Sequence, residues 1–283
     1  MEERIAIIGS RGMLGSDLVV ELSRSYNIIP LTKQDLDITE AETCMKVVKS
    51  LRVAAIINAS GFTNVDGCET SQDEAMLLNG GAVKNLAEAC NATGTMLVHF
   101  STDYVFDGDS SRPYREEDVP HPLSVYGLSK LRGEQAVMKI LSRYIIIRTS
   151  WLYGKAGKNF VDTILRLSKQ QKTLKVVTDQ RGSPTYTRDL AQATTALLKK
   201  KAVGLFHITN SGSCTWYEFA KEIIQQAAGG QIEVLPIDST AFGRPARRPA
   251  YSVLDTEKFN RVTGMHMRPW QEALHEYLRE CLL

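Results

Sequence analysis

Short apolar segments alternate with amphipathic ones along the first half of the chain. Five runs are almost wholly apolar, which is the pattern of strands buried on both faces of a sheet. These runs cover residues 4–8, 27–31, 53–58, 95–100 and 144–148. Helices are expected between them, through about residue 24, over 40–50, over 73–92 and around 126–130. Strands that alternate with helices predict an α/β fold with a doubly wound parallel sheet of the Rossmann type.

The second half of the chain is less regular and richer in loops that contain Gly and Pro. Further strands are expected over 174–177, 205–208 and 232–235, and helices over 159–169, 187–199, 215–227 and 269–281. This pattern predicts a smaller lobe that leaves and rejoins the sheet.

Composition narrows the class of protein. The 283 residues include 43% hydrophobic side chains, enough for a substantial core, and the formal net charge of +2 gives no reason to expect a nucleic-acid partner. The five cysteines are scattered without a Cys-x-x-Cys pair, so no disulfide framework or zinc site is expected. Neither a signal peptide nor a membrane-spanning run is recognisable, and a cytoplasmic protein is expected.

Three glycines follow the first predicted strand with regular spacing. Gly9, Gly12 and Gly15 lie where that strand meets the first helix. Glycine allows a tight turn and a close approach of backbone to phosphate, and a helix N-terminus attracts anions. The motif therefore indicates a nicotinamide dinucleotide, although such glycines can also serve helix–strand packing alone.

The end of the second strand bears on the choice of cofactor. An acidic residue is common there in NAD-selective sites, but this chain has Lys33, and carboxylates follow only at Asp35 and Asp37. Lys33 and Arg11 are suited to a 2′-phosphate, which favours NADPH and leaves NADH possible. The alternative is that Lys33 is a solvated surface residue.

A tyrosine and a lysine four residues apart form the candidate catalytic pair. Tyr126 and Lys130 share one face of a helix, and a nearby ammonium is expected to lower the pKa of the phenol. Thr102 follows the fourth strand, where its hydroxyl is expected to bond a substrate carbonyl while Tyr126 supplies a proton. Alone the spacing is weak, but with the glycine motif it indicates a hydride-transfer enzyme.

These motifs together resemble the extended short-chain dehydrogenase/reductases, and more closely the dTDP-4-dehydrorhamnose reductases of the RmlD type. The closer resemblance extends almost from end to end. It is carried by residues 36–39, 63–66, 78–79, 148–154, 179–185, 215–217, 246–249 and 255–259. It implies NAD(P)H-dependent reduction of the C4 keto group of dTDP-4-dehydro-L-rhamnose.

The resemblance also implies site residues. Tyr126 would be the acid, Lys130 would hold the nicotinamide ribose, and Thr102 would bond the reacting oxygen. The expected cofactor-binding residues are Gly9, Arg11, Gly12, Met13, Leu14, Gly15, Lys33, Asp37, Ile38, Ala59, Ser60, Gly61, Thr63, Asn79, Phe100, Tyr126 and Lys130. The expected substrate-binding residues are Val65, Thr102, Asp103, Tyr104, Tyr126, Trp151 and Arg247.

The chain departs from the family at one candidate metal site. Some members dimerise through Mg²⁺ held by glutamates, but the matching positions here are Asp17, Asp189 and Glu272. Aspartate is shorter, so this site is doubtful, no catalytic metal is expected, and a homodimer is only possible.

A loop in the second half of the chain carries Arg244, Arg247 and Arg248. These side chains suit a nucleotide diphosphate, or they form a solvated loop. Trp216 is expected in the core.

The expected organisation is a dinucleotide-binding domain over 1–154, which segments near 187–210 rejoin, and mainly a discontinuous substrate lobe over 155–283. Two other functions stay open. One is a different nucleotide-sugar reductase or epimerase of the same fold. The other is a non-catalytic NADP-binding regulatory subunit that resembles the beta subunit of methionine adenosyltransferase.

Overall fold

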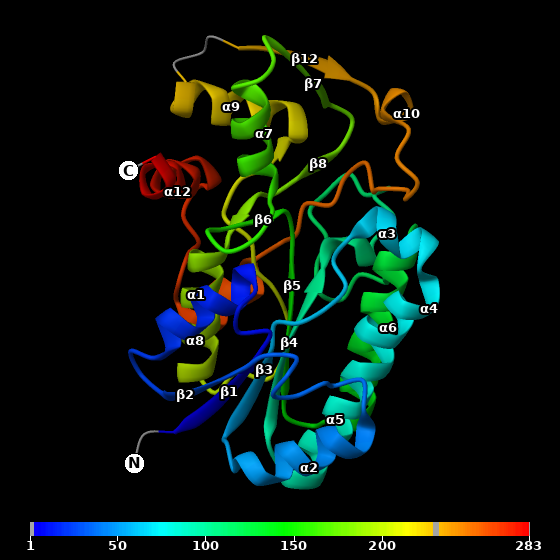
Figure 1. Cartoon of the computed structure of the whole chain (residues 1–283), viewed down its shortest axis with the longest axis vertical. Helices are drawn as coiled ribbons and strands as arrows, with labels where there is room; N and C mark the ends of the chain where they lie inside the picture. The colour runs from blue at the N-terminus through cyan, green and yellow to red at the C-terminus, as the bar shows by residue number, and fades with distance from the viewer. Residues whose placement is uncertain (1–2, 229–231, 283) are drawn as a thin grey trace.

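A six-stranded parallel sheet forms the centre of the computed structural model, which describes residues 3–228 and 232–282 (Figure 1). The strand order is β10-β5-β4-β3-β1-β2. The bounds are β1 Arg4–Ile8, β2 Asn27–Leu31, β3 Ala55–Asn58, β4 Met96–Thr102, β5 Tyr144–Thr149 and β10 Gly204–His207. The order reverses between β1 and β3, which places a crevice at their carboxyl ends. The predicted doubly wound fold is confirmed.

Alternate residues of the central strands face two separate hydrophobic cores. On one face, Ile5 and Ile7 join a core with α1 (Met13–Leu22), α8 (Thr187–Lys199) and α11 (Glu257–Thr263). On the other face, Ala6 and Ile8 join a core with α2 (Ala41–Leu51), α5 (Ala82–Thr93) and α6 (Val125–Ile140). Figure 1 shows these two helix layers on opposite sides of the sheet. Burial on both faces explains the apolar runs of the sequence.

The helix expected over 73–92 is divided. It consists of α4 (Gln72–Met76), a π-helical turn over Leu77–Gly81 and α5. A π turn widens the helix locally and is frequent at functional positions. Here it contains Asn79, whose side chain bonds to backbone outside the helix. The helix α3 (Val65–Thr70), which precedes α4, was not predicted.

A third hydrophobic core lies above the sheet in Figure 1. It is built from α7 (Phe160–Ser168), α9 (Trp216–Ala228), α12 (Trp270–Leu282) and the parallel pair of β7 (Thr173–Val177) and β12 (Glu233–Ile237). The short elements around it are β6 Leu152–Tyr153, β8 Arg181–Gly182, β9 Thr185–Tyr186, β11 Cys214–Thr215 and α10 Ser239–Phe242, and a 3-10 turn over Asp103–Val105 follows β4. The expected boundary at residue 154 stays a prediction.

Within the described part of the chain, no helix has the length and apolar character needed to cross a membrane.

Candidate active site

Three strand ends bring the predicted motifs to one edge of the sheet. β1 ends at Ile8 before the glycine loop, β3 ends at Asn58, and β4 ends at Thr102. Because these strands are parallel neighbours, their carboxyl ends share one rim. The side chains that follow them therefore face a common space.

The glycine loop forms a cradle of the kind that a diphosphate requires. Gly9 has φ +75°, and a Cβ there would lie 3.0 Å from the backbone of Ala59 and Ser60. A Cβ on Gly15 would lie 2.0 Å from the Gly9 carbonyl oxygen, so this glycine also permits close helix–strand packing. The first turn of α1 has no side-chain cap and no acidic residue, which leaves its N–H groups for an anion.

The loop after β3 is fixed by side chains from other elements. The Ser60 hydroxyl donates to Asn58 Oδ1 (2.6 Å), and Asn79 bonds both the N–H and the carbonyl of Phe62 (2.8 and 3.0 Å). A Cβ on Gly61 would lie 2.9 Å from Asn79 Oδ1 and 3.8 Å from Lys130 Nζ. Asn79 therefore shapes the loop beside Lys130 through its side chain.

The expected 2′-phosphate side of the site is open to solvent. Lys33 is 79% exposed and its ammonium lies 3.6 Å from Asp37 Oδ2. Arg11 is exposed as well and lies close enough to Asp35 to lower the pKa of that carboxyl, although the bonds from Thr32 lower it more. Both cationic side chains are thus exposed on the side where a 2′-phosphate is expected, and Lys33 pairs with Asp37 there.

Two predicted cofactor residues have side chains that point into the cores. Leu14 is buried on the α1 face of the sheet, and Ile38 is buried on the opposite face. Only their backbone groups are available to a cofactor. Met13 is partly exposed beside Gly154, and Thr63 is exposed.

Thr102, Tyr126 and Lys130 lie at the end of β4 and in the first turns of α6, each for a local reason. Thr102 is the last residue of β4, and its hydroxyl lies close enough to the Tyr126 hydroxyl to lower the pKa of the phenol. Helix α6 begins just before Tyr126, where Ser124 caps the helix and Glu69 accepts the Val125 N–H. Lys130 lies one turn further along the same helix.

Lys130 is buried beneath the rim. Its ammonium donates to the Phe100 carbonyl at 2.6 Å, so Phe100 takes part through its backbone. Burial lowers the pKa of Lys130 to about 8, and the charge of Glu134 opposes that shift. The lysine therefore titrates close to the physiological range.

The expected lowering of the Tyr126 pKa is wrong for this structure. Burial raises the pKa of the phenol well above its ordinary value of 10.0, and the hydrogen bond to Thr102 opposes this only in part. Low polarity disfavours the phenolate more than its neighbours favour it. Tyr126 is therefore a neutral phenol near pH 7, the form that donates a proton.

Asp103 does not point into the open site. It is 2% exposed, and its two carboxyl oxygens accept from Thr102 (2.9 Å) and from Ser252 (2.5 Å). Burial raises the pKa of Asp103 to about 7, although the bonds from Ser252 and Thr102 lower it. The Asp103 carboxyl group is thus occupied by Thr102 and Ser252, and the contact of this residue with substrate stays a prediction.

Tyr104 lies between this rim and the loop over residues 244–248, called the basic loop because it carries Arg244, Arg247 and Arg248. Its ring meets Tyr126 edge-on at 5.8 Å, and Arg248 lies close enough to its hydroxyl to oppose the rise that burial causes in its pKa. Arg248 and Arg244 each pair with Asp66 at 3.0 Å, which fixes the loop against α3. Arg247 is exposed and lines a neighbouring cavity.

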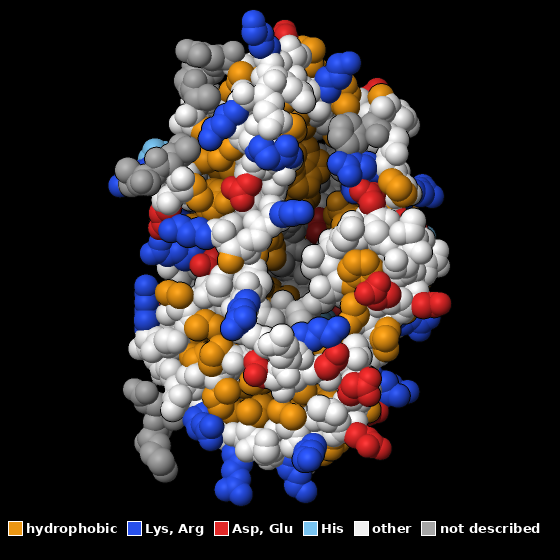
Figure 2. Space-filling view, in the orientation of Figure 1, with side chains coloured by type: hydrophobic (Ala, Val, Ile, Leu, Met, Phe, Trp, Pro, Cys, Tyr) orange, Lys and Arg blue, Asp and Glu red, His pale blue; other side chains and the backbone are white. Residues whose placement is uncertain are grey.

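That cavity has a volume of about 590 Å³ and lies between the third core and the basic loop. Figure 2 shows the molecule hollowed across its middle, with an apolar wall on the side of the upper lobe. The apolar lining comes from Phe160, Ile164, Leu167, Val176, Val177 and Trp216, and the basic lining from Lys175, Arg244, Arg247 and Arg248. A flat apolar group with an attached diphosphate matches this combination.

Two tryptophans meet at the edge of this cavity. Trp151 and Trp216 stack with ring centroids 3.5 Å apart, and Gly182 leaves room for the Trp151 ring. Trp216 was expected in the core. It packs against the third core and also lines the cavity, a contact that its local sequence does not signal.

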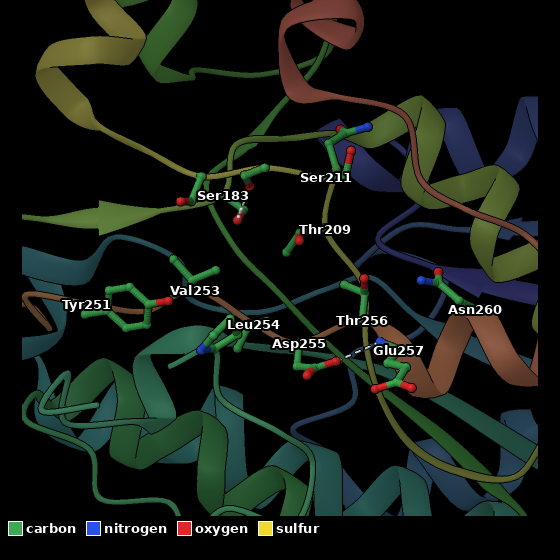
Figure 3. Close-up of a pocket in the computed structure, with 14 residues that line it drawn as sticks. Ser183, Thr209, Ser211, Tyr251, Val253, Leu254, Asp255, Thr256, Glu257 and Asn260 are labelled. Atoms are coloured by element: carbon green, nitrogen blue, oxygen red, sulfur yellow. Dashed lines mark hydrogen bonds between the residues drawn. The ribbon is translucent and has the colours of Figure 1, made fainter. Parts of the chain in front are cut away.

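A second cavity of about 480 Å³ lies beyond β10, and Figure 3 shows Ser183, Thr209 and Tyr251 around it. Its lining is largely hydroxyl and carboxyl groups and includes none of the predicted site residues. Tyr251 and Val253, the chain neighbours of Ser252, belong to its wall.

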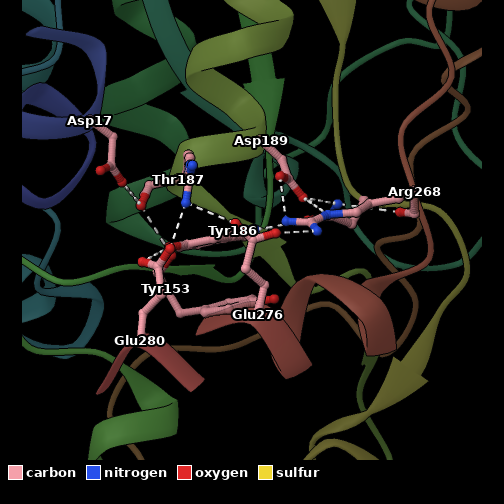
Figure 4. A network of polar contacts seen from close by, with 10 residues as sticks. Asp17, Tyr153, Tyr186, Thr187, Asp189, Arg268, Glu276 and Glu280 are labelled. Atoms are coloured by element: carbon pink, nitrogen blue, oxygen red, sulfur yellow. Dashed lines mark hydrogen bonds and ion pairs between the residues drawn. The ribbon is translucent and has the colours of Figure 1, made fainter. Parts of the chain in front are cut away.

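Two of the three carboxylates of the doubtful metal site are bonded to other side chains. Asp17 accepts from the Thr187 hydroxyl, and Asp189 accepts from Arg268 and Asn210, as Figure 4 shows for Asp17 and Asp189. Among the described residues, no group of three potential ligands is positioned to hold a metal ion.

Comparisons with known proteins agree with this geometry. A family model described as the RmlD substrate binding domain matches residues 3–283. The spore coat polysaccharide biosynthesis protein SpsK of Bacillus subtilis is 40% identical, with 98% of this chain and 97% of that protein covered. The dTDP-4-keto-6-deoxy-D-glucose reductase of Streptomyces niveus is also 40% identical, with 97% and 96% covered.

A crystal structure from Bacillus anthracis, of dTDP-4-dehydrorhamnose reductase in complex with NADP, superimposes with a TM-score of 0.95. It is 41% identical, with 99% of this chain and 100% of that chain covered. Because the family model and these relatives span nearly the whole sequence, the chain belongs to the family of the RmlD substrate binding domain, and the resemblance seen in the sequence is confirmed.

Proposed function

We propose that this protein is an NADPH-dependent oxidoreductase that reduces the C4 keto group of dTDP-4-dehydro-L-rhamnose to give dTDP-L-rhamnose. The observation that carries the proposal is the meeting of Thr102, Tyr126 and Lys130 beside the glycine cradle. Membership of the RmlD family supports the substrate class.

The cofactor is held by the glycine cradle, and the loop after β3 forms its other wall. Backbone N–H groups of the first turn of α1 bind the diphosphate, while Lys33 and Arg11 meet the 2′-phosphate. When bound, the reduced nicotinamide supplies the hydride for the ketone carbon. NADH is the secondary cofactor in this proposal.

The side chains of the rim donate the proton and stabilise the charge that remains. Tyr126, a neutral phenol at pH 7, donates its proton to the substrate oxygen as negative charge develops there. The Lys130 ammonium stabilises the phenolate that remains and orients the nicotinamide ribose. Thr102 lies within hydrogen-bond reach of Tyr126 and bonds the same oxygen.

The nucleotide part of the substrate lies in the larger cavity. Phe160 and Trp216 provide flat apolar walls for the base, and Arg247 faces the diphosphate. The sugar then extends past Tyr104 towards Tyr126, and Val65 and Trp151 flank it.

The test is Tyr126→Phe in a coupled assay with dTDP-4-dehydro-L-rhamnose and each nicotinamide cofactor. A fall in kcat of roughly 10²- to 10⁴-fold is expected, with cofactor affinity by fluorescence titration unchanged. Tyr144→Phe is the matched control, because Tyr144 begins β5 at the opposite edge of the sheet. A Tyr126→Phe variant with the parent rate would refute the assignment.

The open choice is the stereochemistry of the 4-keto sugar. A relative at 40% identity is a dTDP-4-keto-6-deoxy-D-glucose reductase, so that substrate is the second candidate. Resolving the product isomers from both substrates separates the two. Binding of NADPH without turnover of either would favour the regulatory alternative, while a homodimer and a cytoplasmic location stay predictions from the sequence.

A further inference from the structure

Thr102 has a single hydroxyl proton and three polar neighbours. The structure places the Thr102 oxygen 2.9 Å from Asp103 Oδ1 and 3.2 Å from the Tyr104 nitrogen, and close enough to the Tyr126 hydroxyl to lower the pKa of the phenol. A hydroxyl offers one donor and two acceptor positions. With the two bonds to Asp103 and Tyr104 in place, one position is left for Tyr126 or a substrate oxygen, and its direction depends on the other two bonds.

The charge of Asp103 decides where the Thr102 proton lies. An ionised carboxylate is an acceptor only, so Thr102 must donate to it. The Tyr104 N–H occupies one lone pair of the Thr102 oxygen, and the other then takes the Tyr126 proton. In that arrangement Thr102 has no proton for a substrate oxygen, and the phenol is bonded away from it.

A neutral Asp103 reverses this arrangement. Its own O–H then donates to Thr102, whose proton turns towards Tyr126 and the substrate oxygen. Ser252 maintains the geometry, because its hydroxyl holds the second carboxyl oxygen at 2.5 Å and both residues are only 2% exposed.

We propose that Asp103, held by Ser252, is a positioning residue that must be protonated for reduction, because its proton directs the Thr102 hydroxyl and frees the Tyr126 phenol for the substrate. This inference rests on the proposed function. It assigns no contact between Asp103 and the substrate, and it adds Ser252 to the residues on which turnover depends.

The surroundings of Asp103 suit such a role. The titratable groups that its charge affects are Tyr104, from its own turn, and Tyr126, from α6, and it raises the pKa of both. Arg248 lies close to the Tyr104 hydroxyl and pairs with Asp66, so its charge is directed to those groups. With burial dominant, the pKa of Asp103 is raised to about 7, while Lys130 titrates at about 8.

Asp103→Asn is the sharpest variant, because an amide copies the neutral acid. Its NH₂ donates to Thr102 and its oxygen accepts from Ser252. The parent rate is expected to fall as the pH rises through about 7, and then again with Lys130 near 8. Asp103→Asn lacks the first step, so at about pH 8 it retains a several-fold larger fraction of its maximal rate than the parent.

Ser252→Ala tests the same point without touching the carboxyl group. Loss of a donor to the carboxylate raises the pKa of Asp103, so the first step moves to higher pH. Ser101→Ala is the control: Ser101 precedes Thr102, and its hydroxyl has no hydrogen-bond partner among the described residues. This control should keep the parent pH profile.

A second readout needs neither substrate nor cofactor. Infrared difference spectra of the free protein between about pH 6 and about pH 8 should show a protonated carboxyl band that disappears, and Asp103→Asn should lack it. An ionised Asp103 at the lower pH, or a first step that survives in Asp103→Asn, overturns the inference. A parent protein without reductase activity instead overturns the proposed function and leaves the infrared result standing.

Discussion

Glu134 of α6 and Asp103 at the rim both carry buried carboxyl groups, and their hydrogen-bond partners differ. Glu134 lies on α6 one turn beyond Lys130, and its oxygens accept two hydrogen bonds from Arg148 of β5, at 2.9 and 2.6 Å. Asp103 lies at the rim, where its partners are hydroxyl and backbone N–H groups. The two residues are 0% and 2% exposed.

Equal burial therefore produces two different functions. A guanidinium that bonds both carboxylate oxygens forms a strong pair of fixed geometry, and such a pair holds α6 against the sheet. Hydroxyl partners satisfy a carboxyl group in either protonation state, so Asp103 is free to titrate. The Glu134–Arg148 pair lies one turn beyond Lys130, whereas Asp103 lies beside Thr102 at the rim.

The largest expected effect comes from breaking the Glu134–Arg148 pair. Glu134→Gln leaves the Arg148 charge buried without a counter-ion, and we expect a loss of about 3–5 kcal/mol in the free energy of unfolding. Urea denaturation followed by circular dichroism measures it. Glu88→Gln is the matched control, because its pair with Lys84 is exposed and should change stability by less than about 1 kcal/mol.

Removing both partners tests whether the loss comes from the unpaired charge. Glu134→Met with Arg148→Met should be more stable than either single variant, because no charge is left unpaired. If Glu134→Gln unfolds at the same urea concentration as the parent, the pair does not hold α6 in place.

At Asp103 we expect substitution to favour folding as the pH rises, whereas at Glu134 it disfavours folding. Its folded pKa of about 7 lies above the ordinary value of 3.8, so the folded state binds the proton more tightly than the unfolded chain. The parent therefore loses stability as the pH rises towards 7, and the cost is fully present above it. Asp103→Asn does not titrate, so its stability relative to the parent should increase by roughly 3 kcal/mol between about pH 5 and about pH 8.

Unfolding curves of both proteins at the two pH values measure this difference, since the other titrating groups cancel. A gap that stays constant with pH would mean that Asp103 is ionised throughout, and the contrast with Glu134 would disappear.

The features that the sequence predicted depend on neighbouring residues along the chain. The apolar strands, the Gly9 turn and the four-residue spacing of Tyr126 and Lys130 are local patterns, and parallel topology then brings their ends together. The same reasoning placed Thr102 at the rim, because it follows an apolar strand.

The features that the sequence missed depend on distant contacts. Ser252 bonds a residue 149 positions away, and Asp66 holds arginines of a loop near the other end of the chain. The Tyr126 pKa is raised rather than lowered for the same reason. The four-residue spacing shows only that a lysine follows, whereas burial of the phenol depends on the whole fold. Trp216 lines the cavity because of how its lobe packs, and no motif marks that.

The smallest expected effect concerns the ion pairs that join α8 to α12 and to the segment just before α12 (Figure 4). Asp189 is 5% exposed and accepts two bonds from Arg268, each of 2.8 Å, but Arg268 is partly exposed and also pairs with Glu276. Water and Glu276 can therefore compensate Arg268 after Asp189→Asn, and we expect a loss of about 1–2 kcal/mol, less than at Glu134. A double-mutant cycle with Arg268→Gln, measured by urea unfolding with Mg²⁺ and then with a chelator, isolates the pair. The coupling should be equal under both conditions, because Arg268 and Asn210 already occupy the Asp189 oxygens; a coupling that changes with Mg²⁺ would instead restore the metal site at this position.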